Sequence, residues 1–517
     1  MSLTKWQPLA DRNEVDEEGG VGWLELFFDL VYVAALIQFG DRLAEDVSWQ
    51  GIARFAGTFV ILWWTWTGTT AFMNRYAVDD VFHRLLTFAQ MFAVGFFAVL
   101  ATGPVDGRTR WMALAYVMAR LPLMIMYLRV RNLLPGGTSL TNLLLPFFAT
   151  SSVIWLVSMA VPVQIRYWMW AGALLLEFTA PLIGTRKIGL EGGHEEHLRE
   201  RYALFTIIVL GETFVKTLSE LSTIGISIHT QVYGALGFVM LVALWWTYFD
   251  DVAESHLRKR SVLSKRPAGN RILWVYTHLP LAAALTAFGV GSKKVIGVDA
   301  FTGDLKTSYA WLLSGALVVA LLSVAVLDLV TTSPHYAVDS QERVGPRLMA
   351  AAAVAAIGAL LATGTVDTVV GIAAISVVVV AQIAAEVVIA SRRERRLEAR
   401  MDADLSEAAG TCHHLAAATM PEEIGTHACD ECVAHDQRWV QLRVCLTCGY
   451  VGCCDDTPGR HATRHFEETG HATMATLEPG GEWAWCYLHE VMDEHWDPLI
   501  ASHVNEPEIG SQTEVGG

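Results

Sequence analysis

The sequence predicts an all-α polytopic membrane helical bundle of about twelve spans, followed by a small α+β domain. Two observations carry this prediction. Of the 517 residues, 53% are hydrophobic, and the mean hydropathy of +0.36 is well above the globular norm. All eight cysteines lie between Cys412 and Cys486, whereas long apolar runs fill the preceding part of the chain. We therefore expect a membrane domain followed along the chain by a separate cysteine-rich domain.

The charge balance excludes one class of partner. A net charge of −16 argues against a nucleic acid, because binding to phosphates depends on lysine and arginine. The first 20 residues are acidic and polar, so they lack the basic start and apolar core of a signal peptide, and the first apolar run is expected to insert as a span. The lipid bilayer is the predicted partner, and the oligomeric state, a homo-oligomer included, is left open.

Apolar runs of about 20 residues are long enough to cross a bilayer as helices. The first six runs are 24–43, 52–72, 85–102, 111–128, 143–161 and 168–183. The second six are 202–218, 232–249, 272–290, 309–330, 348–363 and 369–390.

Orientation follows from the lysines and arginines, which are concentrated in the even-numbered loops. These loops contain Arg75, Arg84, Arg129, Arg131, Arg186, Lys187, Arg199, Arg201, Arg258, Lys259, Arg260, Lys265, Arg266, Arg271, Arg343 and Arg347. Short basic loops stay in the cytoplasm. We therefore predict a multi-pass protein of the cell membrane with both termini, and the cysteine-rich region, in the cytoplasm.

The cysteine-rich region has the spacing of a zinc-binding domain. A cytoplasmic position favours thiols and metal over disulfides. Cys429 and Cys432, like Cys445 and Cys448, form Cys-x-x-Cys pairs that present two thiolates to one tetrahedral ion. Further ligand types follow at Cys453, His461, His465, His471, Cys486 and His489. The pattern predicts a small zinc-finger domain.

The succession of Cys-x-x-Cys, Trp439, CLTCGYVGCC, HATRH, GH and WAWCYLH resembles the ubiquitin-protease-type (UBP) zinc finger over roughly 412–489. The resemblance implies three structural zinc ions in interleaved four-ligand sites. The implied ligand sets are Cys412, His414, Cys486 and His489; Cys429, Cys432, Cys453 and His461; and Cys445, Cys448, His465 and His471. Cys454 is left over, and His413 competes with His414. Closed four-ligand sites have no open position for a substrate, so the zinc is expected to be structural.

In eukaryotic members the finger binds the C-terminal Gly-Gly of ubiquitin between aromatic walls, with an arginine at the carboxylate. The resemblance implies peptide-binding candidates at Trp439, Trp485 and Tyr487. The expected arginine position holds Asp455, whose charge would repel a carboxylate, and Arg443 is the alternative cation. The aromatic residues have a second interpretation, in which they only pack the small core.

These boundaries give five segments. They are 1–22, a cytoplasmic N-terminal segment; 23–391, the membrane domain; 392–410, a charged helical stalk; 411–498, the zinc finger; and 499–517, a disordered tail.

The motif ELFFDLV and the stretch HLRERYALFTIIVLGET, at 197–213, resemble the low-temperature-requirement A (LtrA) family of bacterial membrane proteins over most of 20–390. The resemblance implies a multi-helix integral membrane protein without an established biochemical activity.

Acidic side chains within the spans are the membrane candidates, since buried charges are costly and usually functional. Glu25 and Asp29 lie four residues apart on one helical face, as in a proton or cation site. The alternative is that both lie at the membrane interface. Glu212 and Lys216 form either an internal ion pair or part of a transport path. Other polar candidates are His197, Arg201, Glu177, Asp250 and Glu386.

Tryptophans near span ends are interpreted as headgroup anchors. They are Trp63, Trp64, Trp66, Trp245 and Trp246.

Three functions remain open. The first is a binding or sensing protein whose finger binds a protein or a peptide C-terminus, and the second is a proton or cation transporter or channel regulated by the finger. The third is a membrane enzyme using His197, Glu200 and Arg201, although neither a Walker motif nor a nucleophile elbow occurs.

Overall fold

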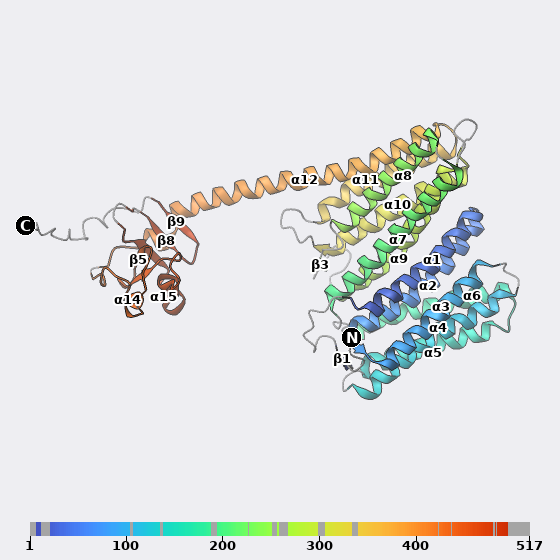
Figure 1. Ribbon diagram of the computed structural model, residues 1–517, viewed down its shortest axis with the longest axis horizontal. Helices are drawn as coiled ribbons and strands as arrows, with labels where there is room; N and C mark the ends of the chain where they lie inside the picture. The colour runs from blue at the N-terminus through green and yellow to red at the C-terminus, as the bar shows by residue number, and fades with distance from the viewer. Residues whose placement is uncertain are drawn as a thin grey trace, which may run out of the picture. The chain divides into compact units, whose positions relative to one another are not determined.

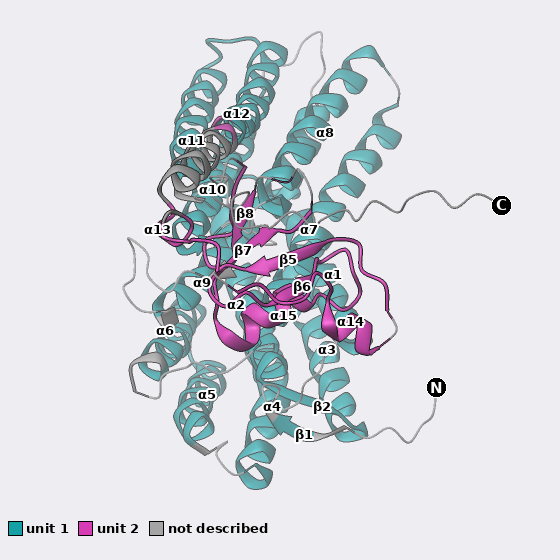
Figure 2. Ribbon diagram, turned by 90° about the vertical axis from the view of Figure 1, so that its left-hand side faces the viewer, with its two compact units in different colours: residues 1–391 teal, residues 392–517 magenta. Residues whose placement is uncertain are grey.

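The computed structural model describes residues 7–11, 21–103, 107–134, 138–187, 194–225, 227–250, 256–257, 267–297, 305–332, 340–421, 423–435, 437–478, 481 and 483–494. The chain divides into two compact units, Met1–Ser391 (unit 1) and Arg392–Gly517 (unit 2), coloured separately in Figure 2. The predicted tail, 499–517, lies outside the described residues, as does most of the segment 1–22.

Unit 1 is built from long helices, one at the position of each predicted apolar run. Their bounds are α1 Trp23–Glu45, α2 Trp49–Arg75, α3 Val81–Thr102, α4 Arg108–Leu133, α5 Thr138–Ser158 and α6 Val163–Lys187. They continue as α7 Glu195–Ile224, α8 Ile228–Phe249, α9 Pro267–Ile296, α10 Thr307–Val330, α11 Ser340–Ala362 and α12 Thr368–Thr411. Helix α12 therefore includes the predicted stalk, 392–410.

The sequence predicts about twelve apolar spans. Among the described residues, ten helices are long and apolar enough to cross a membrane, and α2 and α6 do not meet that composition. Helix α2 is rich in tryptophan, threonine and glycine, and α6 contains Gln164, Arg166 and Glu177, all of which are much less hydrophobic than leucine or valine. The predicted membrane helical bundle followed by a small strand-containing domain is confirmed.

Side-chain caps fix where several helices begin. Ser48 accepts a hydrogen bond from the Gly51 amide at 3.1 Å, and Asp80 accepts one from the His83 amide at 2.8 Å. Such caps satisfy amide groups that have no partner within the helix. These two caps therefore fix the residues at which α2 and α3 begin.

The helices of unit 1 pack in two series with α1 between them (Figure 1). In one series α3 packs on α4, α4 on α5 and α5 on α6; in the other α9 packs on α10 and α10 on α11. Helix α1 contacts α2 and α3 on one side and α7 and α9 on the other. Its residues Phe28, Tyr32 and Leu36 are almost fully buried.

Within the described residues of unit 1, short strands pair beside the helices. Strand β1, Gln7–Asp11, pairs antiparallel with β2, Tyr76–Asp79. Strand β3, His256–Leu257, pairs antiparallel with β4, Thr331–Thr332.

Unit 2 contains an antiparallel sheet with strand order β6-β5-β7-β8-β9. The strands are β5 Leu442–Cys445, β6 Val451–Cys453, β7 Thr473–Thr476, β8 Ala484–Cys486 and β9 Val491–Asp493. Three short helices accompany them: α13 His413–Ala416, α14 Asp430–Ala434 and α15 His461–Thr469. Val444 and Ala475 belong to a buried cluster on one face of the sheet, whereas Met474 packs with Ala462 of α15 on the other.

Glycine is required at two positions that allow this packing. Gly449 has φ of +75°, and a Cβ atom there would lie 2.0 Å from the carbonyl oxygen of Glu423. A Cβ atom at Gly452 would lie 2.6 Å from the Ala462 amide nitrogen. Glycine therefore closes the β5–β6 turn and lets α15 approach the sheet.

Candidate functional site

The first cysteine and histidine group of unit 2 joins three elements. Cys429 and Cys432 flank the start of α14, Cys453 ends β6, and His461 begins α15. The three sulfur atoms lie 3.1, 3.3 and 3.3 Å from His461 Nδ1. His461 Nε2 lies 3.0 Å from a carboxylate oxygen of Glu431. This contact orients Nδ1 toward the sulfurs, the arrangement expected around a metal-ligating histidine.

A second group includes Cys445 at the end of β5 and Cys448 in the β5–β6 turn. Cys445 Sγ is 3.6 Å from His471 Nδ1, and Cys448 Sγ is 3.4 Å from His465 Nε2. The two histidine nitrogens are 3.3 Å apart. Tyr450 stacks on the His465 ring at 4.2 Å, which holds the imidazole in place. Helix α15 thus contributes His461 to the first group and His465 to the second.

The third group ties α13 to β8. Cys412 Sγ and Cys486 Sγ lie 3.3 and 3.6 Å from His489 Nδ1, and His414 Nδ1 lies 3.3 Å from the same atom. His414 belongs to the group, whereas the His413 ring lies tilted against the His414 ring with a centroid separation of 3.9 Å. His489 is exposed, so this group is more open than the one around His461.

The separations suit tetrahedral zinc. Zinc–sulfur bonds of about 2.3 Å and zinc–nitrogen bonds of about 2.0 Å give tetrahedron edges of roughly 3.3–3.8 Å. In each group all ligand atoms lie within 4.8 Å of one another. Each group offers four such ligands, so it would leave no position for a catalytic water. Cys454 is buried beside Thr457, outside the three groups of described residues.

The electrostatics of the His461 group also favour a cation. Burial raises the pKa of the Cys432 thiol to about 12, and the neighbouring Cys429 and Cys453 add to the rise. The thiolate, which is the form that binds metal, therefore needs a positive charge beside it. A bound zinc ion would supply that charge.

The four peptide-binding candidates do not all lie together. Trp439 packs against the cluster that contains Val444, whereas Arg443 lies on the opposite face of the sheet by strand alternation. Trp485 shares the face of Arg443, because it pairs with Met474, which lies opposite Cys445. The structure therefore separates Trp439 from the other candidates.

Trp483 is a neighbour of Arg443 that the sequence interpretation omitted. The Arg443 guanidinium lies 4.8 Å from the centre of the Trp483 ring, and Arg443 Nε is buried without a hydrogen-bond partner among the described residues. Trp485 meets Tyr487 edge to face at 6.4 Å. The spacing of Trp483 and Trp485 in WAW was the available signal, since alternate strand residues share a face.

The Asp455 carboxylate accepts hydrogen bonds from other residues of the finger. Thr463 and Arg460 donate hydrogen bonds to its carboxylate at 2.5 and 3.1 Å. Partial burial raises the pKa of Asp455, but these hydrogen bonds outweigh burial and lower it. Asp455 therefore remains an anion, with the Arg460 guanidinium compensating part of its charge.

In unit 1 the structure brings Glu25, Asp29, His197 and Arg201 together. Arg201 donates two hydrogen bonds to Asp29, at 2.6 and 3.0 Å, and lies 3.5 Å from Glu25. Glu25 is 2.9 Å from His197 Nε2, and Trp66 donates to Asp29 at 2.7 Å. Both motifs of the sequence, on α1 and α7, meet in this cluster.

Glu212 lies apart from that cluster. It is three turns beyond Arg201 on α7, about 16 Å at 1.5 Å per residue. Lys216 Nζ lies 3.8 Å from Glu212 and 3.5 Å from Asp41. The ion-pair interpretation of Glu212 is the one these distances favour. Glu200 is exposed, whereas His197 and Arg201 are buried, so the three enzyme candidates do not form one site.

Two more buried arginines form ion pairs between helices. Arg120 of α4 pairs with Glu177 of α6, which also accepts hydrogen bonds at 2.8 Å from Tyr116 and Trp64. Arg347 of α11 pairs with Asp328 of α10 and, at 2.9 Å, with Glu386 of α12. Sequence reasoning noted Glu177 and Glu386 but missed Arg120 and Asp328, although a charge inside an apolar run was the signal.

Two sequence interpretations are corrected by burial. Arg201 and Arg347, counted as basic loop residues, are fully buried within helices because they neutralise carboxylates there. Trp63, Trp64 and Trp66, interpreted as headgroup anchors, have at most 4% of their surface exposed because they pack inside the bundle. Trp245 and Trp246 are more than 40% exposed, as an anchoring position requires.

Family models of known proteins match both parts of the chain. The family model for the bacterial low temperature requirement A protein matches residues 20–385, and the model for the zinc finger in ubiquitin-hydrolases and other proteins matches 429–495. An uncharacterized protein of Rhizobium meliloti is 32% identical over 296 residues, 54% of this chain and 70% of its own length.

Shorter matches to other proteins were also found. The BRCA1-associated proteins of mouse and human are 29% identical over 98 residues, which cover 18% of this chain and 16% of theirs. A solution NMR structure of a Rhodopseudomonas palustris protein is 45% identical, covers 16% of this chain and 83% of its own, and superposes with a TM-score of 0.16.

The buried cluster on α1 and α7 makes a stability prediction. We expect Arg201→Met to lower the free energy of unfolding by about 3–5 kcal/mol, because it leaves the Asp29 carboxylate buried without its cation. Thermal unfolding of the purified protein in detergent measures this as a large fall in Tm. Glu200→Gln, which removes an exposed charge from the same helix, is the control. Equal Tm values for the two variants would show that Arg201 is not needed to neutralise Asp29.

Proposed function

The chain belongs to the bacterial low temperature requirement A (LtrA) family, and we propose that its membrane unit anchors a zinc-stabilised finger that binds proteins through a free peptide C-terminus. The membrane helices and the finger are established features of the chain. The binding activity, the three zinc ions and the cytoplasmic position of the finger are parts of the proposal.

Arg443 is the observation that carries the proposal. Its guanidinium stacks on Trp483, while its Nε is buried without an acceptor among the described residues. A buried donor of this kind is costly unless a ligand completes it. A terminal carboxylate is planar and anionic, as an arginine site requires. Trp485 on the same sheet face offers apolar surface for the adjoining backbone.

Asp455 limits which peptides can bind. Its negative charge is partly compensated by Arg460, so it lowers the affinity for a carboxylate without excluding one. The resemblance implies an arginine at position 455 to bind the carboxylate. In the proposed site Arg443 of β5 has that role instead. Trp439 lies on the other face of the sheet and takes no part in the proposed site.

Three zinc ions would hold this surface in shape. Each proposed ion has two or three thiolates and one or two histidines, and every ligand set joins segments that are distant in sequence. A domain this small has too little apolar core to fold without such links. The finger is therefore proposed to fold and bind zinc in one equilibrium.

Proton or cation transport receives less support. Glu25 and Asp29 are paired with Arg201, and Glu212 lies about three helical turns away, so these acidic groups do not form one path. An enzymatic role for His197, Glu200 and Arg201 has less support still, since Glu200 is directed to the surface.

Zinc stoichiometry tests the three ion sites. We expect the purified full-length protein to contain three zinc ions per chain by inductively coupled plasma mass spectrometry. Cys453→Ser should reduce the content to two or fewer, because it removes one of the four ligands around His461. Cys454→Ser is the matched control, since Cys454 is a neighbouring buried cysteine outside the groups. A control that also loses zinc, or a wild type with two ions, would contradict the proposed ligand sets.

Peptide binding tests the function itself. We expect a fluorescent peptide that ends in Gly-Gly with a free carboxylate to bind the full-length protein in detergent, as measured by fluorescence polarisation. Arg443→Gln should weaken binding roughly tenfold or more, because a hydrogen bond to a charged group is worth about 1.5–3 kcal/mol.

Two controls accompany that measurement. Arg438→Gln removes an exposed arginine that precedes β5, and it should leave the affinity unchanged. The second control is the same peptide with an amidated C-terminus. Its affinity for the wild-type protein should be no higher than the affinity of the free peptide for the Arg443→Gln variant. If free and amidated peptides bind equally well, carboxylate recognition is wrong even where zinc content is normal.

A further inference from the structure

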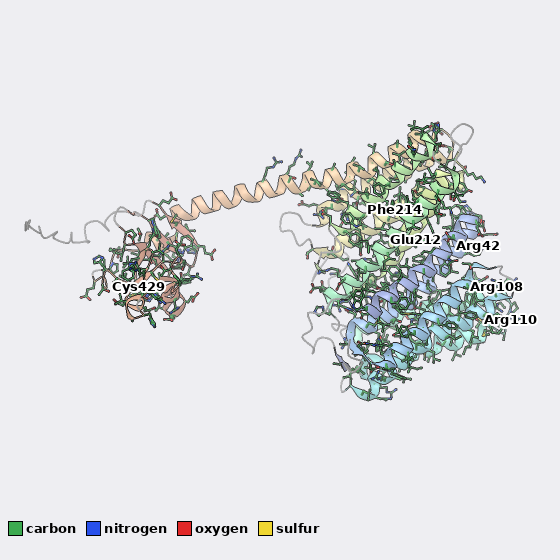
Figure 3. The ribbon with its side chains drawn as sticks, viewed as in Figure 1. Arg42, Arg108, Arg110, Glu212, Phe214 and Cys429 are labelled. Carbon is green, nitrogen blue, oxygen red and sulfur yellow. The ribbon has the colours of Figure 1, made fainter. Side chains whose placement is uncertain are left out.

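A cavity of unit 1 lies at one end of the helices, far from the Arg201 cluster along the helix axes. It has a volume of about 650 Å³ and is lined by the end of α1, the starts of α2, α4 and α6, and the end of α3. Figure 3 shows Arg42, Arg108 and Arg110 at this end of the unit. The volume lies within the about 300–1,000 Å³ that is usual for ligand pockets.

The inner walls of the cavity are apolar. Phe39, Phe55, Ile61, Met112 and Trp170 line it, and all five are largely buried. Such walls exclude a small hydrophilic ion as the whole ligand, because they would desolvate it without compensation. They suit a hydrocarbon chain.

The mouth of the cavity is cationic. Arg42, Arg54 and Arg108 line it together with one carboxylate, Asp46. Arg54 is 2.9 Å from Asp46, and Arg42 pairs with Glu45. Neither an ion pair nor a hydrogen bond involves Arg108 within the described part of the chain. Its guanidinium packs where a Cβ atom at Gly103 would lie only 1.7 Å away, so glycine makes room for it.

A further positive charge lies behind the wall. Arg166 is 3% exposed and donates hydrogen bonds to Thr109, which lines the cavity, and to the carbonyl oxygens of Ser158 and Val161 at 2.9 and 2.8 Å. Carbonyl oxygens solvate this guanidinium without cancelling its charge. The field at the mouth therefore favours an anion.

We propose that this cavity is a binding site for an anionic phospholipid, with the headgroup phosphate on Arg108 and Arg42 and an acyl chain against Phe39, Phe55 and Trp170. Arginine is well suited to phosphate, because its planar donors match two oxygens at once. The loop charges predict that this end of unit 1 faces away from the cytoplasm, so the lipid would come from the outer leaflet of that membrane.

Native mass spectrometry of the full-length protein in detergent tests the site. We expect the first phosphatidylglycerol to bind more tightly than phosphatidylcholine with the same acyl chains. Arg108→Gln should weaken the phosphatidylglycerol affinity roughly tenfold, the size expected for hydrogen bonds to a charged group. Arg110→Gln, at the same helix end but outside the lining, should leave it unchanged.

A second pair of variants tests the acyl chain independently of charge. Gly57 lines the cavity, and a Cβ atom there would have open space, so Gly57→Leu fills the cavity while favouring the α2 helix. It should abolish the tight first binding event. Gly172→Leu is the control, because Gly172 is equally open but lies outside the lining.

Three outcomes would overturn the proposal. One is equal affinity for phosphatidylglycerol and phosphatidylcholine. Another is an Arg108 or Gly57 variant that binds like its control. The third is displacement of the lipid by glycerol phosphate at concentrations close to those of the lipid, which would identify an anion site that does not need an acyl chain.

Discussion

Three fully buried guanidinium groups in the membrane unit are neutralised by carboxylates from other helices, and these ion pairs constrain the helix packing. Arg120 joins α4 to α6 through Glu177, Arg201 joins α7 to α1 through Asp29, and Arg347 joins α11 to α10 and α12. A misplaced helix would leave a charge unpaired in an apolar surrounding, at a cost of several kcal/mol. The three arginines thus specify neighbours, whereas apolar side chains alone would pack in many ways.

In the finger, the proposed metal ligands would have the same effect of fixing which segments are neighbours. Its core is small, and Cys445, Cys453 and Cys486 each end a strand, so zinc ligation would fix strand ends that hydrophobic packing leaves loose. Arg443 lies on the sheet face opposite the cluster that contains Val444 and Ala475, and it stacks there on Trp483. In the proposed function these two side chains contact the ligand. In the proposed function, zinc ligation and ligand recognition use different side chains of one sheet, so a change of ligand specificity need not disturb the fold.

From the sequence, the proximity of candidate side chains could be predicted where spacing decides geometry. The Cys-x-x-Cys pairs and the i, i+4 relation of Glu25 and Asp29 place side chains together through local backbone alone. Prediction failed where a partner is remote: Trp63 and Trp66 look like interfacial residues in sequence but fill the interior, and Arg347 looks like a loop charge but neutralises Asp328. Nothing local distinguishes an exposed tryptophan or arginine near a helix end from a buried one.

The sequence by itself determined the class of each part, because hydropathy over 20 residues and the spacing of thiols and imidazoles are properties of short segments. It also determined the family through ELFFDLV and the cysteine pattern. Only the tertiary structure decided that Glu25 and Asp29 share Arg201 while Glu212 does not, that Trp439 and Arg443 lie on opposite sheet faces, and that Arg108 has an apolar cavity beneath it. These are contacts between segments up to 170 or so residues apart, and their geometry depends on how helices and strands pack, which local patterns do not encode.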